Sequence, residues 1–358
     1  MSTASTRITT VERLREYLYL AMQLEHATIP PYLTALYSLK PGTNSDAYHV
    51  IRVVAVEEML HLTLDANMLN AIGGSPDLTA PSFVPDYPAF LPDGETDFQV
   101  SRQRFSREAM QNILEIERPK QTLSEQHRLV RRSAPKAQQL AVVPGEPSMQ
   151  YYSIGEFYAE IGRGFRYLHK EMGDALFRGD PARQVGKEYF YSGGGELTTV
   201  TDLDSAEVAI RLISEQGEGY GGRIYDEHRE LAHYYRFEQL LLGRYYLDGD
   251  QPGQPTGPAL SVDWDAVYPI KQDARLADYP AGSELRDAAV AFNRAYADFL
   301  GLLTKAFTGQ PELLIEAVTG MFRLRDLMIQ LIRNPIPGLD GVNAAPTFEM
   351  AAAAVVSS

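Results

Sequence analysis

A glutamate and a histidine interrupt the apolar face of a long helical pattern. The stretch 45–72 has the periodicity of one helix, which ends at Gly73-Gly74. Its inward stripe consists of Val50, Val54, Glu58, His61, Asp65, Leu69 and Ile72. Residues three apart on a helix point the same way, so Glu58 and His61 can reach one metal ion. Because a buried carboxylate is costly unless it is paired or bound to metal, the two residues indicate a metal half-site or a Glu–His ion pair.

The preceding helical pattern supplies a third candidate ligand. A capping box opens this helix near residue 10, and its inward face carries Leu14, Leu18, Ala21 and Glu25. Di-metal sites in four-helix bundles take a lone glutamate from one helix and an E-x-x-H pair from the next. Glu25, Glu58 and His61 occur in that order, which predicts half of such a site. A Pro-Pro pair at 30–31 is expected to kink or break the first helix.

The other half of the site must come from later helices. A third long helix is predicted over 153–177, and Glu160 lies between the apolar residues Phe157 and Ile161. We therefore take Glu160 as the next ligand. Glu156 is the alternative, although its place in a capping box gives it a structural role.

Two interpretations compete for the last ligands. Glu215 and Glu218 are three apart just before a glycine-rich segment, and His233 would return to the metal from the following helix. We favour Glu215, Glu218 and His233. The alternative is the literal second E-x-x-H pair, in which Glu230 replaces Glu218 beside His233.

The remaining pattern predicts an all-α four-helix bundle in a single domain, 1–358. Its core spans 9–76 and 150–247, and the proline-rich stretch 77–149 is an insertion between the second and third long helices. The smaller expected elements are short helices at 106–117 and 122–132, a β-hairpin at 189–200, helices at 204–218 and 225–246, and helices at 283–308 and 311–333 within a C-terminal extension, 276–350.

Composition excludes several classes of protein. The chain has no cysteine, so any metal must be held by His, Asp and Glu. With 33 Lys and Arg against 47 Asp and Glu, the net charge is −14, which argues against nucleic-acid and anionic-membrane partners. No apolar stretch is long enough for a membrane span, and the N-terminal residues are polar, so we expect a cytoplasmic protein. Phosphate-loop and serine-hydrolase motifs are absent from the sequence.

Several phrases of the sequence resemble one family. They are LEHATIPPYL at 24–33, EEMLHL at 57–62, NAIGGSP at 70–76, IGEFY at 154–158, EQGEG at 215–219, HYYRFE at 233–238 and APTFE at 345–349. Together they are similar to the ferritin-like domain named after iminophenyl-pyruvate dimer synthase, which occurs in the violacein and rebeccamycin/staurosporine pathways. The resemblance covers about 10–245 well and 283–349 loosely, and it does not specify a substrate.

The resemblance implies non-haem iron and oxidative chemistry on an amino-acid-derived molecule in natural product biosynthesis. The family's metal ligands would fall on Glu25, Glu58, His61, Glu160, Glu215, Glu218 and His233. Carboxylate-rich ligation suits iron, as one or two Fe(II)/Fe(III) ions, and also manganese. The expected partners are a small-molecule substrate and O2, and a homodimer is compatible with the sequence. The alternatives are a ferroxidase or iron-storage protein and a metal-free helical interaction protein.

Overall fold

The computed structural model describes residues 7–92, 98–119, 153–190, 194–219, 223–226 and 228–350, and their secondary structure is helical. The α-helices are α1 (Val11–Ser38), α2 (Ser45–Ala71), α3 (Arg107–Ile116), α4 (Ile154–Met172), α5 (Leu203–Glu218), α6 (His233–Leu242), α7 (Glu284–Ala306) and α8 (Leu313–Ile332). Short 3₁₀ helices lie at Gly173–Leu176, Pro181–Arg183, Lys187–Tyr189 and Leu276–Asp278. The described residues form isolated β-bridges but no sheet, which confirms the predicted all-α class.

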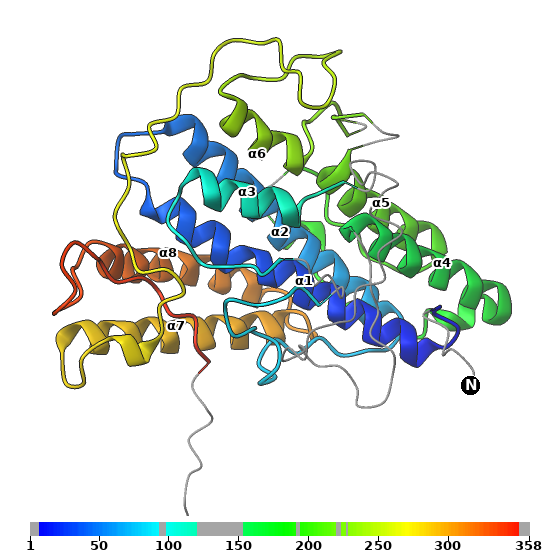
Figure 1. Ribbon diagram of the computed structural model, residues 1–358. Coiled ribbons are helices and arrows are strands. Elements are labelled where there is room, and N and C mark those ends of the chain that lie inside the picture. Colours follow the sequence, from blue (N-terminus) through cyan, green and yellow to red (C-terminus); the bar gives the residue numbers. More distant parts are fainter. Residues whose placement is uncertain are drawn as a thin grey trace, which may run out of the picture.

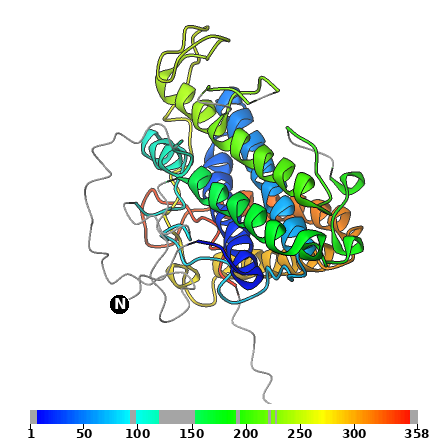
Figure 2. The ribbon, with the colours of Figure 1, turned by 90° about the vertical axis from the view of Figure 1, so that its right-hand side faces the viewer.

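A four-helix bundle forms the centre of the molecule. The antiparallel α1–α2 pair packs against the α4–α5 pair, with α1 on α4 and α2 on α5. In Figure 1, α6 lies at the top, α3 lies between α6 and α1, and the α7–α8 hairpin lies below α1, which it contacts through α8. The quarter-turn view shows the green α4–α5 pair crossing in front of the blue α1–α2 pair (Figure 2). The α1–α2 pair is therefore covered by other helices on more than one side.

The helix α1 runs through its two prolines without a break, so the predicted break is wrong. Pro31 has no N–H to donate to the carbonyl of Ala27, four residues earlier. The hydroxyl of Tyr87, from the loop after α2, donates to that carbonyl instead, at 2.7 Å. Beyond the prolines, Thr34 donates its hydroxyl to the Pro30 carbonyl, also at 2.7 Å. A side chain from outside the helix thus supplies a bond that the proline removes.

Most other helix boundaries lie close to the predicted ones, and three expectations need comment. The helix expected at 225–246 starts only at His233, because residues 225 and 231 pair as an isolated β-bridge. The described residues of 189–200 form no strand, so the β-hairpin is wrong. The short helix expected at 122–132 lies outside the described residues.

One apolar core connects the bundle with the C-terminal hairpin. It includes buried aromatic residues such as Tyr17 on α1 and Phe157 on α4, whose rings stack with centroids 5.6 Å apart. Phe292 of α7 belongs to the same core. Within the described part of the chain, every helix is too short or too polar to cross a bilayer.

Candidate metal centre

Three side chains from α1 and α2 converge inside the bundle. Glu25, Glu58 and His61 are each at most 3% exposed. Each offers one ligand atom, and these atoms lie within 4.8 Å of one another. The Nδ1 atom of His61 is 3.5 Å from Oε2 of Glu25 and 3.5 Å from Oε2 of Glu58. We call these residues the first group.

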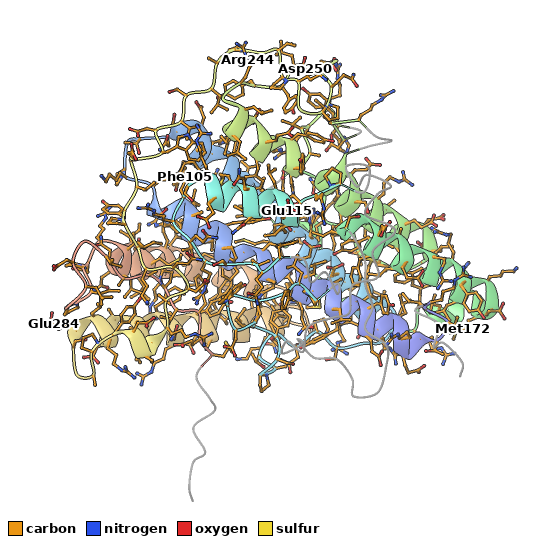
Figure 3. All side chains as sticks on the ribbon, in the orientation of Figure 1. Phe105, Glu115, Met172, Arg244, Asp250 and Glu284 are labelled. Atoms are coloured by element: carbon orange, nitrogen blue, oxygen red, sulfur yellow. The ribbon has the colours of Figure 1, made fainter. Side chains whose placement is uncertain are left out.

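A second group shares Glu58 with the first. Its other members are Glu117, which follows the last residue of α3, and His233, the first residue of α6. The Nδ1 atom of His233 is 2.9 Å from Oε1 of Glu58 and 3.6 Å from Oε2 of Glu117. Glu58 thus turns one carboxylate oxygen toward each histidine. Figure 3 labels Glu115, two residues before Glu117, at the end of α3 that points toward α4 and α5 in that view.

Both histidines are oriented by hydrogen bonds at the far side of their rings. Nε2 of His61 lies 2.8 Å from the amide oxygen of Gln216 on α5, whose amide nitrogen donates to the Gly194 carbonyl. Nε2 of His233 lies 2.8 Å from a carboxylate oxygen of Glu57. An acceptor at Nε2 keeps a proton there, which leaves the Nδ1 lone pair free to bind a metal.

Two buried tyrosines hold the carboxylates of the two groups. Tyr158 of α4 donates its hydroxyl hydrogen between Oε1 of Glu25, at 2.5 Å, and Oδ2 of Asp65, at 2.7 Å. Tyr32 of α1 donates to Oε1 of Glu117 at 2.5 Å. Burial and the neighbouring carboxylates raise the pKa of both phenols well above the usual range, so both remain hydrogen-bond donors.

Glu57 is a buried carboxylate that accepts a hydrogen bond from His233. It is fully buried and accepts a hydrogen bond from Arg236 at 3.0 Å as well as one from His233. Burial opposes ionisation, but the bond from His233 and the charge of Arg236 lower the pKa of Glu57 to about 2. Glu57 is therefore an anion at neutral pH.

The groups themselves concentrate negative charge in a buried space. Burial and the charge of Glu58 raise the pKa of Glu25 to about 7. Burial would lower the pKa of His61, yet its contacts with Glu25 and Glu58 raise that pKa to about 10. Without metal, protons on the histidines thus balance the carboxylates. A divalent cation would provide the same compensation and displace those protons.

The donor set fits a metal of the iron or manganese type. Carboxylate oxygens and imidazole nitrogens are the ligands that these ions favour. The buried Nδ1 of His233 makes no hydrogen bond of acceptable geometry among the described residues, although Glu58 is near. The described residues enclose about 10 Å³ beside the cluster, which is water-sized. An open nitrogen and a small space bordered by carboxylates and imidazoles are what a metal site requires.

The structure brings together Glu25, Glu58, His61 and His233, but it does not bring Glu160 to them. The Glu160 carboxylate pairs with Arg163 and accepts the backbone N–H of Ile8 at 2.7 Å. The inward residue of α4 is Tyr158, and Glu160 is two positions, or about 200°, further round the helix. The expected ligand therefore anchors the segment before α1 instead.

The other predicted ligands have different outcomes. Glu215 is buried but belongs to neither group, and the side chain of Glu218 lies outside the described residues. Glu156, the alternative on α4, belongs to neither group. Glu230 has a half-exposed side chain that pairs with Arg236, so His233 meets Glu58 and Glu117 without it. The literal second E-x-x-H pair does not form a single helical face, because α6 begins at His233.

Sequence reasoning missed Glu117, although its sequence carried a signal. Met110 and Ile113 are buried on one face of α3, and Glu117 continues that stripe four residues later. The same pattern singled out Glu25. The insertion between the second and third long helices thus supplies a ligand candidate as well as a covering helix.

Comparisons with known proteins agree with this architecture. A family model described as ferritin-like matches residues 18–242. The chain belongs to the ferritin-like family. It is 27% identical over 329 residues to a dichlorochromopyrrolate synthase from Lentzea aerocolonigenes, which covers 83% of this chain. These findings confirm the resemblance stated from the sequence.

The chain spans 29% of the length of that synthase. Among solved structures, it is similar to a ferritin-like protein from Caulobacter vibrioides, with a TM-score of 0.60 and 24% identity. That match covers 90% of this chain and 96% of the Caulobacter protein, and it supports the fold.

Proposed function

We propose that this ferritin-like protein is a non-haem iron oxidoreductase that uses O2 on an amino-acid-derived small molecule in secondary metabolism. The observation that carries the proposal is the pair of buried three-residue groups sharing Glu58. The similarity to a dichlorochromopyrrolate synthase supports the substrate class. Bound Fe(II) would supply the electrons that reduce O2.

The protein residues would have distinct roles at such a centre. Glu25 and His61 would hold one ion, Glu117 and His233 would hold the other, and Glu58 belongs to both groups. Tyr158 and Tyr32 each occupy one carboxylate oxygen, at Glu25 and Glu117, which leaves the second oxygen directed toward the histidines. The ligands are thereby held in place before any ion binds.

Metal analysis of anaerobically purified protein tests the first part of the proposal. We expect one to two equivalents of iron per chain, or binding of Fe(II) in a calorimetric titration. Glu58→Gln should lose this binding, and the matched control Glu115→Gln should retain it, because Glu115 has a half-exposed side chain on α3. Protein that is metal-free and rejects both Fe(II) and Mn(II) would contradict the proposal.

A ferroxidase is the second candidate, and one observation favours it. The space beside the cluster, about 10 Å³, admits water-sized species and excludes an organic substrate unless neighbouring segments move. In a ferroxidase, iron itself is the substrate.

Oxygen consumption separates the two functions. The reduced iron-loaded protein should consume O2 faster with aromatic amino acids or their 2-imino acids than alone, because an oxidase must withhold its oxidant until a substrate is bound. Uptake that ignores the organic compound and scales with added Fe(II) would favour the ferroxidase.

A further inference from the structure

A second cavity lies on the opposite side of the α1–α2 pair from the carboxylate cluster. It has a volume of about 480 Å³, and residues of α1, α2, α7 and α8 line it. On α2, Met59 and Leu62 face this cavity, whereas the adjacent residues Glu58 and His61 face the cluster. Among the described residues, none lines both spaces. The volume falls in the range of small-molecule binding sites.

Aromatic rings and aliphatic side chains together form the walls of the cavity. The lining rings from α7, α8 and the C-terminal segment are Phe292, Tyr296, Phe299, Phe307, Phe322 and Phe348. Aromatic side chains favour stacked and edge-on contacts with other rings, beyond the gain from buried area. These walls therefore favour a flat apolar body.

The buried end of the cavity holds an open polar atom. His26, next to Glu25 on α1, is 3% exposed and lines the cavity. Its Nε2 lies 2.6 Å from the Tyr296 hydroxyl, and its Nδ1 has no hydrogen-bond partner in the described part of the chain. Leaving a buried nitrogen without a partner costs free energy, which a polar atom of a bound molecule would recover.

The mouth of the cavity is positively charged. Arg52 is exposed and forms no ion pair within the described ranges, and Arg325 pairs only with its neighbour Asp326. Burial and the neighbouring Tyr48 raise the pKa of Tyr37 to about 12, although the charges of both arginines lower it. The two cations therefore lie near this phenol, which also lines the cavity. Phe322 beside them is 58% exposed, so apolar surface and cationic groups meet at the entrance.

We infer that this cavity binds an arylalkanoic acid, with its aromatic body between α1–α2 and α7–α8 and its carboxylate at Arg52 and Arg325. Guanidinium groups match a carboxylate in charge and geometry. The aromatic walls favour the body, and His26 offers a hydrogen bond to a polar substituent on the inner edge of that body. The site is separate from the metal centre, so it stands whether or not the proposed function is correct.

Fluorescence titration of the full chain tests the site with 1-pyrenebutyrate and its uncharged match, 1-pyrenebutanol. We expect the acid to bind about fivefold more tightly than the alcohol, the usual scale of one accessible ion pair. Arg52→Gln should remove that preference. Arg323→Gln, an exposed α8 position that does not line the cavity, should retain it.

Filling the cavity provides an independent measurement. Ala317→Phe, at a fully buried lining position, should weaken binding of the acid about tenfold. A second variant leaves the buried core untouched. Val318 lines the cavity and is 40% exposed, and Val318→Trp should also weaken binding. Equal binding of acid and alcohol, tighter binding of palmitate than of 1-pyrenebutyrate, or unchanged binding in both filled variants would overturn the inference.

Discussion

The two groups of the candidate metal centre are built in different ways. The first takes Glu25, Glu58 and His61 from the interiors of the two longest helices, where backbone hydrogen bonds fix each position on both sides. The second takes Glu117 from the end of the ten-residue α3 and His233 from the start of the ten-residue α6. The bundle itself therefore preforms the first group, whereas the second also requires α3 and α6 to dock.

Removal of the shared carboxylate should have the largest effect. Glu58→Gln deprives both groups of a ligand, so we expect Fe(II) affinity to fall by about 100-fold or more, since changing an outer partner alone costs 10- to 100-fold. Calorimetric titration measures the loss, and circular dichroism should show an intact helical content. A global loss of helix would mean that Glu58 is a structural ion-pair residue.

Single-group variants should distinguish the preformed group from the docked one. Glu25→Gln should remove one binding phase and leave the second group, whereas Glu117→Gln should do the reverse. We expect a drop of about one equivalent in each, measured by stoichiometric titration with Mn(II). Loss of both phases in either variant would show that the two groups act as one site.

The partners at Nε2 should have a smaller effect. Gln216→Ala frees the ring of His61, and Glu57→Gln replaces the charged acceptor of His233 by a neutral one. Such partners set ring orientation and basicity, so we expect affinity to fall about tenfold in the corresponding group only. Glu230→Gln is the matched control, because this half-exposed carboxylate pairs with the other terminal nitrogen of Arg236 and belongs to neither group. Equal losses in all three variants would contradict the assignment.

The smallest effect should come from a helix cap that contacts neither group. Asp202 caps α5 through Ser205, whose hydroxyl and backbone N–H lower the pKa of the carboxyl. A depressed folded-state pKa gives stability that is present above the unfolded value, about 3.9, and is lost as pH falls below it. Asp202→Ala should thus cost about 1 kcal/mol at pH 7 and less at pH 3. Guanidinium unfolding at both pH values measures this, and metal stoichiometry should not change.

Helical periodicity was sufficient to bring the first group together, whereas for the second it marks Glu117 only as an inward position of a short helix. Glu25, Glu58 and His61 lie on long helical stripes whose other members are mostly apolar, so local sequence places them. Glu117 meets Tyr32, 85 residues away in sequence, and only the docking of α3 brings them together. No spacing rule encodes that long-range contact.

The separation of Glu160 from the two groups has a different origin. Apolar residues flank Glu160 on α4, and Glu160 is two positions from Tyr158, so the two side chains point in nearly opposite directions. The sequence cannot show which face of the helix points inward when both faces contain apolar residues. The inward residue Tyr158 donates a hydrogen bond to the Glu25 carboxylate and is not itself an acidic ligand. A search of the sequence for acidic ligands overlooks such a residue.

The prolines of α1 have a mechanical consequence for the centre. Glu25 of the first group lies on one side of Pro30-Pro31, and Tyr32, which holds Glu117 of the second, lies on the other. A helix that lacks hydrogen bonds at one step bends there at lower cost, and the loop residue Tyr87 braces that step from outside the bundle. The loop after α2 therefore stabilises α1 at its weakest step. Loosening this loop would shift Tyr32, and with it Glu117, relative to Glu25, although no ligand would be removed.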